Sequence, residues 1–240
     1  MNTSTYSMFS IILFFANAYT QDYPLLEKLR YYCLPASANP YTWFNNNFHT
    51  VQEGACYRSK TLTAAQLEAI IKKYDIKTIL NLRESYGFWF DQECEVARKN
   101  DINLYTVTLN AKRLPSKEEV QRIEKIFEKK KNFPILIHCQ AGADRTGTIA
   151  AFWELTQKNS TLQEALDQQR PYYGHFSWRY PYMRKFTEIM YNLKNKYNND
   201  WKRVLEAYNP EHYMQQYPLL PLHKRIMNQV SCFFSGRYIN

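Results

Sequence analysis

The sequence predicts an α/β fold in which a mostly parallel sheet of four or five strands is flanked by helices. Short apolar runs rich in β-branched residues alternate along the chain with segments whose apolar residues recur every three or four positions. Hydrophobic residues make up 45% of the 240 residues and charged residues 22%, as in ordinary globular domains. These observations favour one parallel-sheet domain with extensions at both ends.

The N-terminus has the pattern of an export signal. The apolar run Met8–Ala16 is followed by Ala16-Asn17-Ala18, which has the form of a signal-peptidase site. The run is too short to cross a bilayer, and no other stretch is long enough. We expect residues 1–18 to be a signal peptide and the protein to be periplasmic or secreted. A buried N-terminal helix in a cytoplasmic protein is the alternative, because no Lys or Arg precedes the run.

The first predicted elements follow an N-terminal arm at residues 19–50, which we expect to be irregular. The folded domain is expected to span residues 51–195. Cys56–Ser59 predicts the first strand. Thr63 and Gln66 then form a capping box, and apolar residues at helical spacing predict a helix. The next expected elements are a strand at Lys77–Leu82, a helix at Glu93–Lys99 and a strand at Leu104–Leu109.

The second half of the chain continues this alternation. Ser116 and Glu119 form another capping box, and apolar residues at helical spacing follow it. The next expected elements are a central strand at Ile135–His138, helices at Thr148–Leu155 and Thr161–Gln168, and a long helix with apolar residues from Met183 to Leu193. Residues 196–240 predict a basic, aromatic and partly helical C-terminal extension.

One stretch between the central strand and the next helix has an unusual composition. Residues 138–147, here called the signature loop, read HCQAGADRTG and contain two of the six glycines. A loop between a strand and a helix can point its backbone N–H groups into one concavity, and the helix N-terminus adds its positive dipole end. Gly142 permits the sharp path that this requires, and Gly147 permits close entry into the helix. The signature loop therefore predicts a phosphate site.

Cys139 and Arg145 equip this loop for covalent phosphate chemistry. The positive field of the loop favours the thiolate of Cys139 over its thiol. A thiolate that faces a bound phosphorus atom is an in-line nucleophile, and the planar guanidinium of Arg145 can hold two phosphate oxygens. The expected reaction is hydrolysis through a phosphocysteine.

HCQAGADRTG resembles the signature H-C-x-x-G-x-x-R-[ST]-G of the protein tyrosine phosphatase superfamily. Tyr57–Arg83 resembles the opening of the small atypical dual-specificity phosphatases, which carry a YRS element, a helix and an apolar strand that ends in LR. The resemblance covers residues 50–192 and implies a single-domain cysteine-phosphatase fold. It implies neither a metal nor an organic cofactor.

The resemblance also implies a role for each residue of the signature loop. Cys139 is expected to be the nucleophile, and Arg145 the clamp for the phosphate and the transition state. His138 is expected to shape the loop and support the thiolate, while Thr146 donates its hydroxyl to the thiolate. The residues expected to bind phosphate oxygens, mainly through backbone N–H groups, are Gln140, Ala141, Gly142, Ala143, Asp144 and Arg145.

The sequence departs from the family pattern at the general acid. The family usually places an Asp on a mobile loop upstream of the signature strand, but here residues 110–116 read NAKRLPS. An alkoxide leaving group still needs a proton. Asp144 is the best replacement, since myotubularin-like lipid phosphatases and certain bacterial phosphatases carry Asp at this place. Its alternative role is to orient Arg145 or the loop. The weaker acid candidates are Glu118, Asp91 and Asp101.

The leading predicted function is phosphatase activity on protein phosphotyrosine, or with dual specificity. Phosphoinositides and inositol phosphates are the first alternative, because of the Asp in the loop and the basic surface. Gln140 and Ala143 argue against this alternative, since several lipid phosphatases have an extra Lys in the loop. A phosphate-binding module without turnover is another alternative, as is a sulfur-transfer or arsenate-reducing cysteine enzyme.

Charge limits the kinds of partner. The net charge of +9 and the pI of about 9.2 favour anionic partners without choosing among them. Arg170–Phe186 interleaves cations with aromatic residues, and we favour an ordinary loop and helix start over a wall of the substrate cleft. We expect no nucleic-acid partner, because no binding motif accompanies this stretch. We expect His175 within it to be an ordinary structural histidine.

The five cysteines show no metal-binding spacing; they are Cys33, Cys56, Cys94, Cys139 and Cys232. If Cys139 is kept free in an exported protein, the other four could pair. Four separate thiols are the alternative.

Overall fold

A single five-stranded sheet forms the centre of the computed structural model, which describes residues 46–226. The predicted signal peptide, most of the arm and residues 227–240 lie outside the described residues. The strands are β1 (His49–Gln52), β2 (Cys56–Lys60), β3 (Thr78–Asn81), β4 (Asn103–Thr106) and β5 (Ile135–Cys139). They lie in the order β1-β2-β5-β3-β4; β1 is antiparallel to β2, and the other neighbours are parallel. The predicted α/β fold is confirmed.

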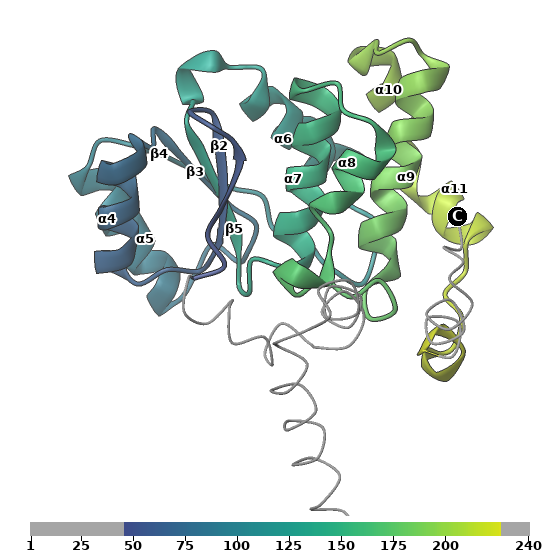
Figure 1. Cartoon of the computed structure of the whole chain (residues 1–240), viewed down its shortest axis with the longest axis horizontal. Coiled ribbons are helices and arrows are strands. Elements are labelled where there is room, and N and C mark those ends of the chain that lie inside the picture. The colour runs from purple at the N-terminus through teal and green to yellow at the C-terminus, as the bar shows by residue number, and fades with distance from the viewer. Residues whose placement is uncertain (1–45, 227–240) are drawn as a thin grey trace, which may run out of the picture.

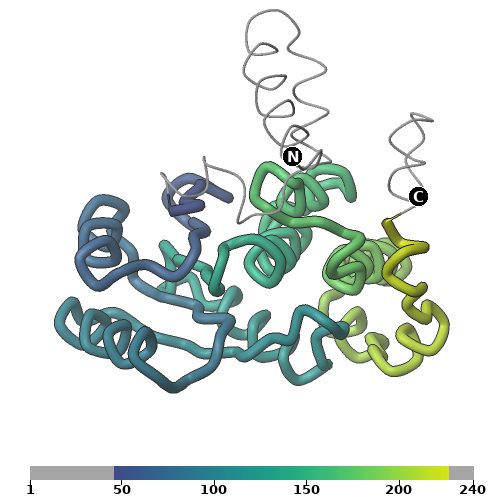
Figure 2. Tube along the Cα trace, turned by 90° about the horizontal axis from the view of Figure 1, so that it is seen from below, coloured from purple at the N-terminus to yellow at the C-terminus, as the bar shows by residue number. Residues whose placement is uncertain are grey.

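Helices cover both faces of the sheet (Figure 1). On one face lie α4 (Ala64–Tyr74) and α5 (Phe88–Lys99); on the other lie α6 (Lys117–Phe127), α7 (Asp144–Gln157), α8 (Leu162–Asp167) and α9 (Pro181–Lys196). Two short 3-10 turns are η3 (Lys130–Asn132) and η4 (Pro171–Tyr173). Figure 2 shows α4 and α5 at one end of the molecule and α10 (Trp201–Ala207) and α11 (Pro210–Gln216) at the other.

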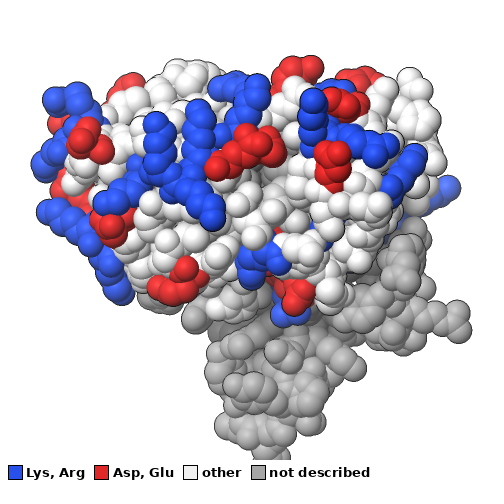
Figure 3. Space-filling model, turned by 90° about the horizontal axis from the view of Figure 1, so that it is seen from above, with Lys and Arg blue, Asp and Glu red and all other residues white. Residues whose placement is uncertain are grey.

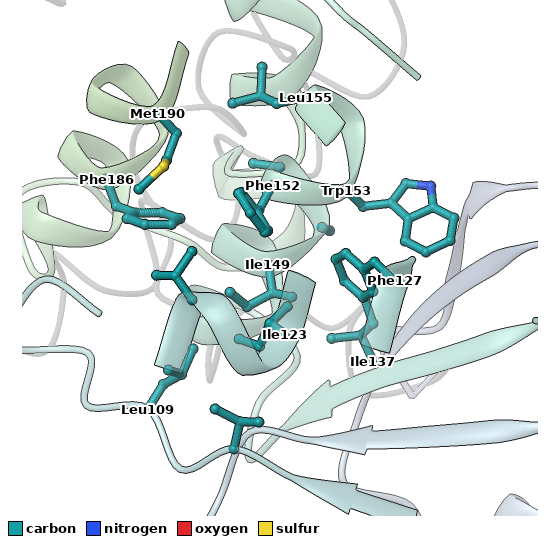
Figure 4. Packing of buried hydrophobic residues seen from close by; sticks show 14 of the residues in the cluster. Leu109, Ile123, Phe127, Ile137, Ile149, Phe152, Trp153, Leu155, Phe186 and Met190 are labelled. Carbon is teal, nitrogen blue, oxygen red and sulfur yellow. The ribbon is translucent and has the colours of Figure 1, made fainter. Parts of the chain in front are cut away.

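The two faces of β5 belong to two clusters of buried residues. Ile135, Ile137 and Cys139 lie in the cluster with α6, α7 and α9, whereas Leu136 lies in the cluster with α4 and α5. Alternate side chains of a strand point to opposite faces of a sheet. Cys139 therefore faces α7. The aromatic part of the larger cluster, shown in Figure 4, includes Phe127, Phe152, Trp153 and Phe186.

The predicted element boundaries differ from the structure in several places. Both predicted capping boxes are confirmed, with Thr63 and Ser116 as the N-caps. The sequence does not predict β1, because the arm has no alternating pattern; pairing with β2 makes it a strand. The strand predicted up to Leu109 ends at Thr106. Helix α7 begins at Asp144, inside the signature loop and earlier than predicted.

The first part of the C-terminal extension packs against the rest of the molecule. Val204, Leu205 and Tyr208 are buried in the larger cluster, and the Tyr208 hydroxyl donates a 2.7 Å hydrogen bond to the carbonyl oxygen of Pro115. The predicted partly helical character is confirmed by α10 and α11. The hydrophobic core thus includes residues beyond position 195.

Within residues 46–226, no helix is long and apolar enough to cross a bilayer. Cys56, Cys94 and Cys139 are free thiols, whereas Cys33 and Cys232 lie outside the described residues. On the face shown in Figure 3, Lys and Arg side chains are interspersed with Asp and Glu.

Candidate active site

Cys139 is the last residue of β5 and lines a cleft of about 700 Å³. The Cys139 side chain lies among buried residues, with only 3% of the residue exposed. Gln140, Ala141, Asp144 and Arg145 line the same cleft. The structure therefore brings five of the predicted site residues together.

The signature loop turns at Gly142, whose φ is +68°. A Cβ atom at this position would lie 2.6 Å from the carbonyl carbon of Ser59 and 2.7 Å from the nitrogen of Lys60, both in the backbone of β2. The left-handed φ and this close approach together require glycine.

Four consecutive carbonyl groups of the loop are hydrogen-bonded to groups outside it. Thr61 donates from its hydroxyl to the oxygen of Cys139 (3.0 Å) and from its backbone N–H to that of Gln140 (3.3 Å). The remaining two carbonyl oxygens, of Ala141 and Gly142, accept from the Asn47 side-chain amide (2.9 Å) and from Arg58 Nη2 (2.8 Å). In a trans peptide the C=O and N–H point in opposite directions. The N–H groups of residues 140–143 therefore point away from these four donors.

The start of α7 adds further donors to the loop. The first backbone hydrogen bond of α7 runs from the N–H of Gly147 to the carbonyl oxygen of Ala143, over 2.8 Å. The N–H groups of Asp144, Arg145 and Thr146 precede it and have no intrahelical acceptor. Together with the helix dipole, they make this end of α7 suited to an anion. Gly147 is needed here, because a Cβ atom would lie 2.8 Å from the Gln168 carbonyl oxygen.

Arg58 on β2 is fully buried beside the loop. Besides Gly142, its guanidinium donates from Nη1 to the carbonyl oxygen (2.6 Å) and to Oε1 (3.0 Å) of Gln168. It also lies over the Tyr173 ring, 4.0 Å from the centroid. Burial lowers the pKa of Arg58 to about 10, so the group remains a cation at neutral pH. A buried positive charge thus lies directly behind the predicted phosphate site.

The Arg145 side chain extends from α7 to two other segments, at Leu82 and Leu109. Its Nη1 donates to the carbonyl oxygens of Leu82 (3.2 Å) and Leu109 (3.4 Å). These bonds hold the guanidinium at the cleft, which Arg145 lines.

Asp144 faces a histidine from a distant part of the chain. Oδ1 of Asp144 lies 2.8 Å from Nδ1 of His175. The His175 side chain is 1% exposed and the Asp144 side chain 21% exposed. The interpretation of His175 as an ordinary structural histidine is thus incomplete, because its ring contacts a residue of the cleft.

Other residues of the signature loop lie behind the cleft. His138 faces the opposite side of β5, where its Nε2 lies 2.6 Å from Glu93 Oε1 and its side chain lines a separate pocket of about 140 Å³. Gly142 and Ala143 are buried, so they face the site through their backbone only. The Thr146 hydroxyl is buried without a hydrogen-bond partner among the described residues.

The walls of the cleft come from three other segments. Asn110–Arg113 lie on one side of the cleft, in the predicted loop after β4. Arg179 and Tyr180 also line the cleft, so the favoured interpretation of Arg170–Phe186 as an ordinary loop and helix start is wrong at these residues. Glu84 is a cleft carboxylate that sequence reasoning missed. The weaker acid candidates Glu118, Asp91 and Asp101 are not among the residues that line the cleft.

Sequence reasoning also missed the residues that orient the loop. Arg58 belongs to the YRS element, which was a signal of resemblance only. Thr61 and Asn47 are short polar residues of common type, and Asn47 lies in the arm expected to be irregular. Nothing in their spacing relates them to positions 139–142. Parallel pairing of β2 with β5 brings Arg58 and Thr61 to the loop. Asn47 reaches it because β1 pairs with β2 and Lys60 N–H donates to the neighbouring Asn46 carbonyl oxygen.

The chain is similar in sequence to known phosphatases. A family described as "DSP-PTPase phosphatase fused to NAD+ Kinase" matches residues 36–178. The dual specificity protein phosphatase TpbA of Pseudomonas aeruginosa (strain UCBPP-PA14) is 25% identical over 115 residues, which are 48% of this chain and 49% of TpbA. The chain spans about half the length of the curated relatives it matches.

Two solved structures share the fold. TpbA of P. aeruginosa in complex with phosphotyrosine has a TM-score of 0.51 at 16% identity, over 68% of this chain and 90% of that one. The catalytic core of the PP-IP phosphatase Siw14 from S. cerevisiae, in complex with citrate, has a TM-score of 0.51 at 24% identity, over 67% and 94%. Since the family match covers more than half of the chain, this protein belongs to the family of DSP-PTPase phosphatases fused to NAD+ kinase, within the cysteine-based phosphatases.

Proposed function

We propose that this protein hydrolyses phosphate monoesters through a phosphocysteine at Cys139. The observation that carries this proposal is the convergence of Cys139, Asp144 and Arg145 on one cleft at the N-terminus of α7. The loop N–H groups and the helix dipole supply positive potential for a phosphate dianion. The family of the chain supports the same chemistry.

In the first step, the Cys139 sulfur attacks phosphorus in line with the leaving oxygen. An S–P bond forms and the P–O bond breaks, and its electron pair goes to the leaving oxygen. Asp144 donates a proton to that oxygen. Arg145 holds phosphate oxygens through the Nε and Nη2 edge of its guanidinium, since Nη1 bonds the Leu82 and Leu109 carbonyls.

In the second step, water attacks the phosphocysteine. An O–P bond forms, the S–P bond breaks, and the water proton returns to Asp144. The Thr146 hydroxyl donates a hydrogen bond to the departing thiolate. The products are inorganic phosphate and the dephosphorylated alcohol or phenol.

Protein phosphotyrosine, alone or with dual specificity, is the proposed substrate class. Tyr180 and Arg179 at the cleft offer an aromatic face and a cation to a phosphotyrosine ring and its anionic flank. The similarity to a dual specificity phosphatase supports this class. Inositol phosphates and phosphoinositides are the second candidate, because Lys112, Arg113 and Arg179 place three further cations around the cleft.

Hydrolysis of p-nitrophenyl phosphate by the reduced full chain tests the mechanism. We expect turnover in the unchanged protein and none in Cys139→Ser, which keeps the shape of the side chain. Phosphate binding without turnover would favour the non-catalytic phosphate-binding module.

Substrate class is tested with phosphotyrosine peptides and soluble inositol polyphosphates, on the unchanged protein and on Lys112→Ala. A phosphotyrosine phosphatase should prefer the peptides, and Lys112→Ala should change their kcat/KM by less than about threefold, as expected for a lost surface ion pair. Preference for the inositol polyphosphates, with a strong loss in Lys112→Ala, would establish the second candidate.

A further proposal concerns the N-terminus of the chain. We propose that residues 1–18 direct export and are removed, as the A-x-A site supports. N-terminal sequencing of the protein from its native host tests this, with cleavage after Ala18 expected.

A further inference from the structure

We propose that His175 is a positioning residue for Asp144, holding its carboxyl group so that it serves as the general acid. The proposal rests on the proposed function, because it concerns the proton that the leaving group takes. Its structural basis is the 2.8 Å approach of His175 Nδ1 to Asp144 Oδ1.

The surroundings of His175 determine which nitrogen carries the proton. Its Nε2 is buried and has no hydrogen-bond partner within the described residues. An N–H at Nε2 would be buried without an acceptor, which is unfavourable. The neutral ring therefore carries its proton on Nδ1 and donates it to Asp144 Oδ1.

This contact determines which carboxyl oxygen of Asp144 donates the proton. With Oδ1 accepting from His175, Oδ2 remains for the proton that passes to the leaving oxygen. After the transfer Asp144 is a carboxylate, and a hydrogen bond from a donor to a carboxylate is stronger than one to a neutral acid. The His175 contact thus stabilises the product of proton donation more than its starting state.

The segment that carries His175 is held at both sides. Before it, the Asn47 side-chain amide donates to the Tyr173 carbonyl oxygen over 2.9 Å, and Gly174 N–H donates to the Pro171 carbonyl oxygen over 2.8 Å. After it, Arg179 N–H donates to the Phe176 carbonyl oxygen over 2.9 Å. Asn47 also bonds the Ala141 carbonyl oxygen, so one side chain ties this segment to the signature loop. Such bonds limit the movement of His175 relative to Asp144.

Leaving-group dependence tests the proposal in the full chain. The substrates are p-nitrophenyl phosphate, whose leaving group needs little protonation, and β-glycerophosphate, whose alkoxide needs a proton. Asp144→Asn should lose about 10²–10⁴-fold in kcat on β-glycerophosphate and far less on the aryl ester. His175→Leu, which removes the donor, should lose about tenfold or more on the alkyl ester alone, since it removes one charge-assisted hydrogen bond. His223→Leu, at an exposed histidine outside the cleft, is the matched control and should change neither rate.

Two more variants separate positioning from a merely structural role. His175→Asn keeps an N–H donor near the place of Nδ1, so it should restore most of the alkyl-ester rate. The double variant His175→Leu with Asp144→Asn should be no slower than Asp144→Asn alone, because both changes remove one function. Equal losses on both substrates, no rescue by Asn, or multiplied losses in the double variant would overturn the proposal. Absence of turnover in the unchanged protein, or turnover in Cys139→Ser, would instead reject the proposed function.

Discussion

The guanidinium of Arg58 donates a 2.8 Å hydrogen bond to the carbonyl oxygen of Gly142, so a buried cation on β2 holds the turn of the signature loop. The same guanidinium also bonds Gln168, which follows α8. One side chain thereby connects the sheet, the signature loop and the segment after α8.

Arg58→Met should lower both stability and activity. It leaves the carbonyl oxygens of Gly142 and Gln168 buried without a donor, which costs about 1–3 kcal/mol for each group. Arg58→Lys keeps the charge but not the planar fork, so we expect better stability than for Met and still a reduced kcat. Urea unfolding and p-nitrophenyl phosphate turnover measure the two effects. Full activity in both variants would contradict a role in orienting the loop.

Gly142→Ala should be more damaging than Gly54→Ala, although both glycines have φ of +68°. A Cβ atom at Gly54 has nothing within 4 Å, so this variant isolates the backbone strain, about 1 kcal/mol. At Gly142 the Cβ atom would also collide with the backbone of Ser59 and Lys60. We expect loss of turnover and a larger fall in the free energy of unfolding. Equal effects of the two substitutions would show that β2 moves away without consequence.

His49 should make the protein less stable as pH falls. Burial, and secondarily the Arg58 charge, lower the pKa of His49 from 6.5 to about 4. Between these values the unfolded chain binds a proton at this histidine and the folded chain does not. The contribution of His49 to the free energy of unfolding is therefore fully present above pH 6.5 and is lost as the pH falls toward 4. We expect the Tm to fall less in His49→Gln than in the unchanged protein between about pH 7.5 and about pH 5. The same fall in both proteins would count against this assignment.

Tyr208→Phe should reduce stability without changing catalysis. Its hydroxyl donates to the Pro115 carbonyl oxygen in a buried position, and losing that bond costs about 1–3 kcal/mol. Tyr86→Phe, at a side chain that is 76% exposed, is the matched control. Thermal unfolding of both variants measures the difference. No difference between them would mean that the hydrogen bond from Tyr208 to Pro115 adds little to the stability of the domain.

Much of the fold could be predicted from local pattern. The capping boxes at Thr63 and Ser116 and the apolar runs of β3 and β5 gave the helices and the parallel strands, because cap hydrogen bonds and side-chain periodicity act over a few residues. Strand β1 has no such local pattern. It is a strand because β2 supplies hydrogen-bond partners for its backbone.

The sequence by itself determined which residues make up the candidate site, since the proposed nucleophile, the arginine and the acidic residue lie within seven positions of one strand-loop-helix unit. Only the tertiary structure decided what surrounds them. His138 and Cys139 are neighbours in sequence, yet the alternation of a strand sends them to opposite faces, one to Glu93 and the other to the cleft. Asn47, Arg58, Thr61 and His175 come to the loop from distant segments. Their roles depend on strand pairing and helix packing over long separations, which local residue patterns do not encode.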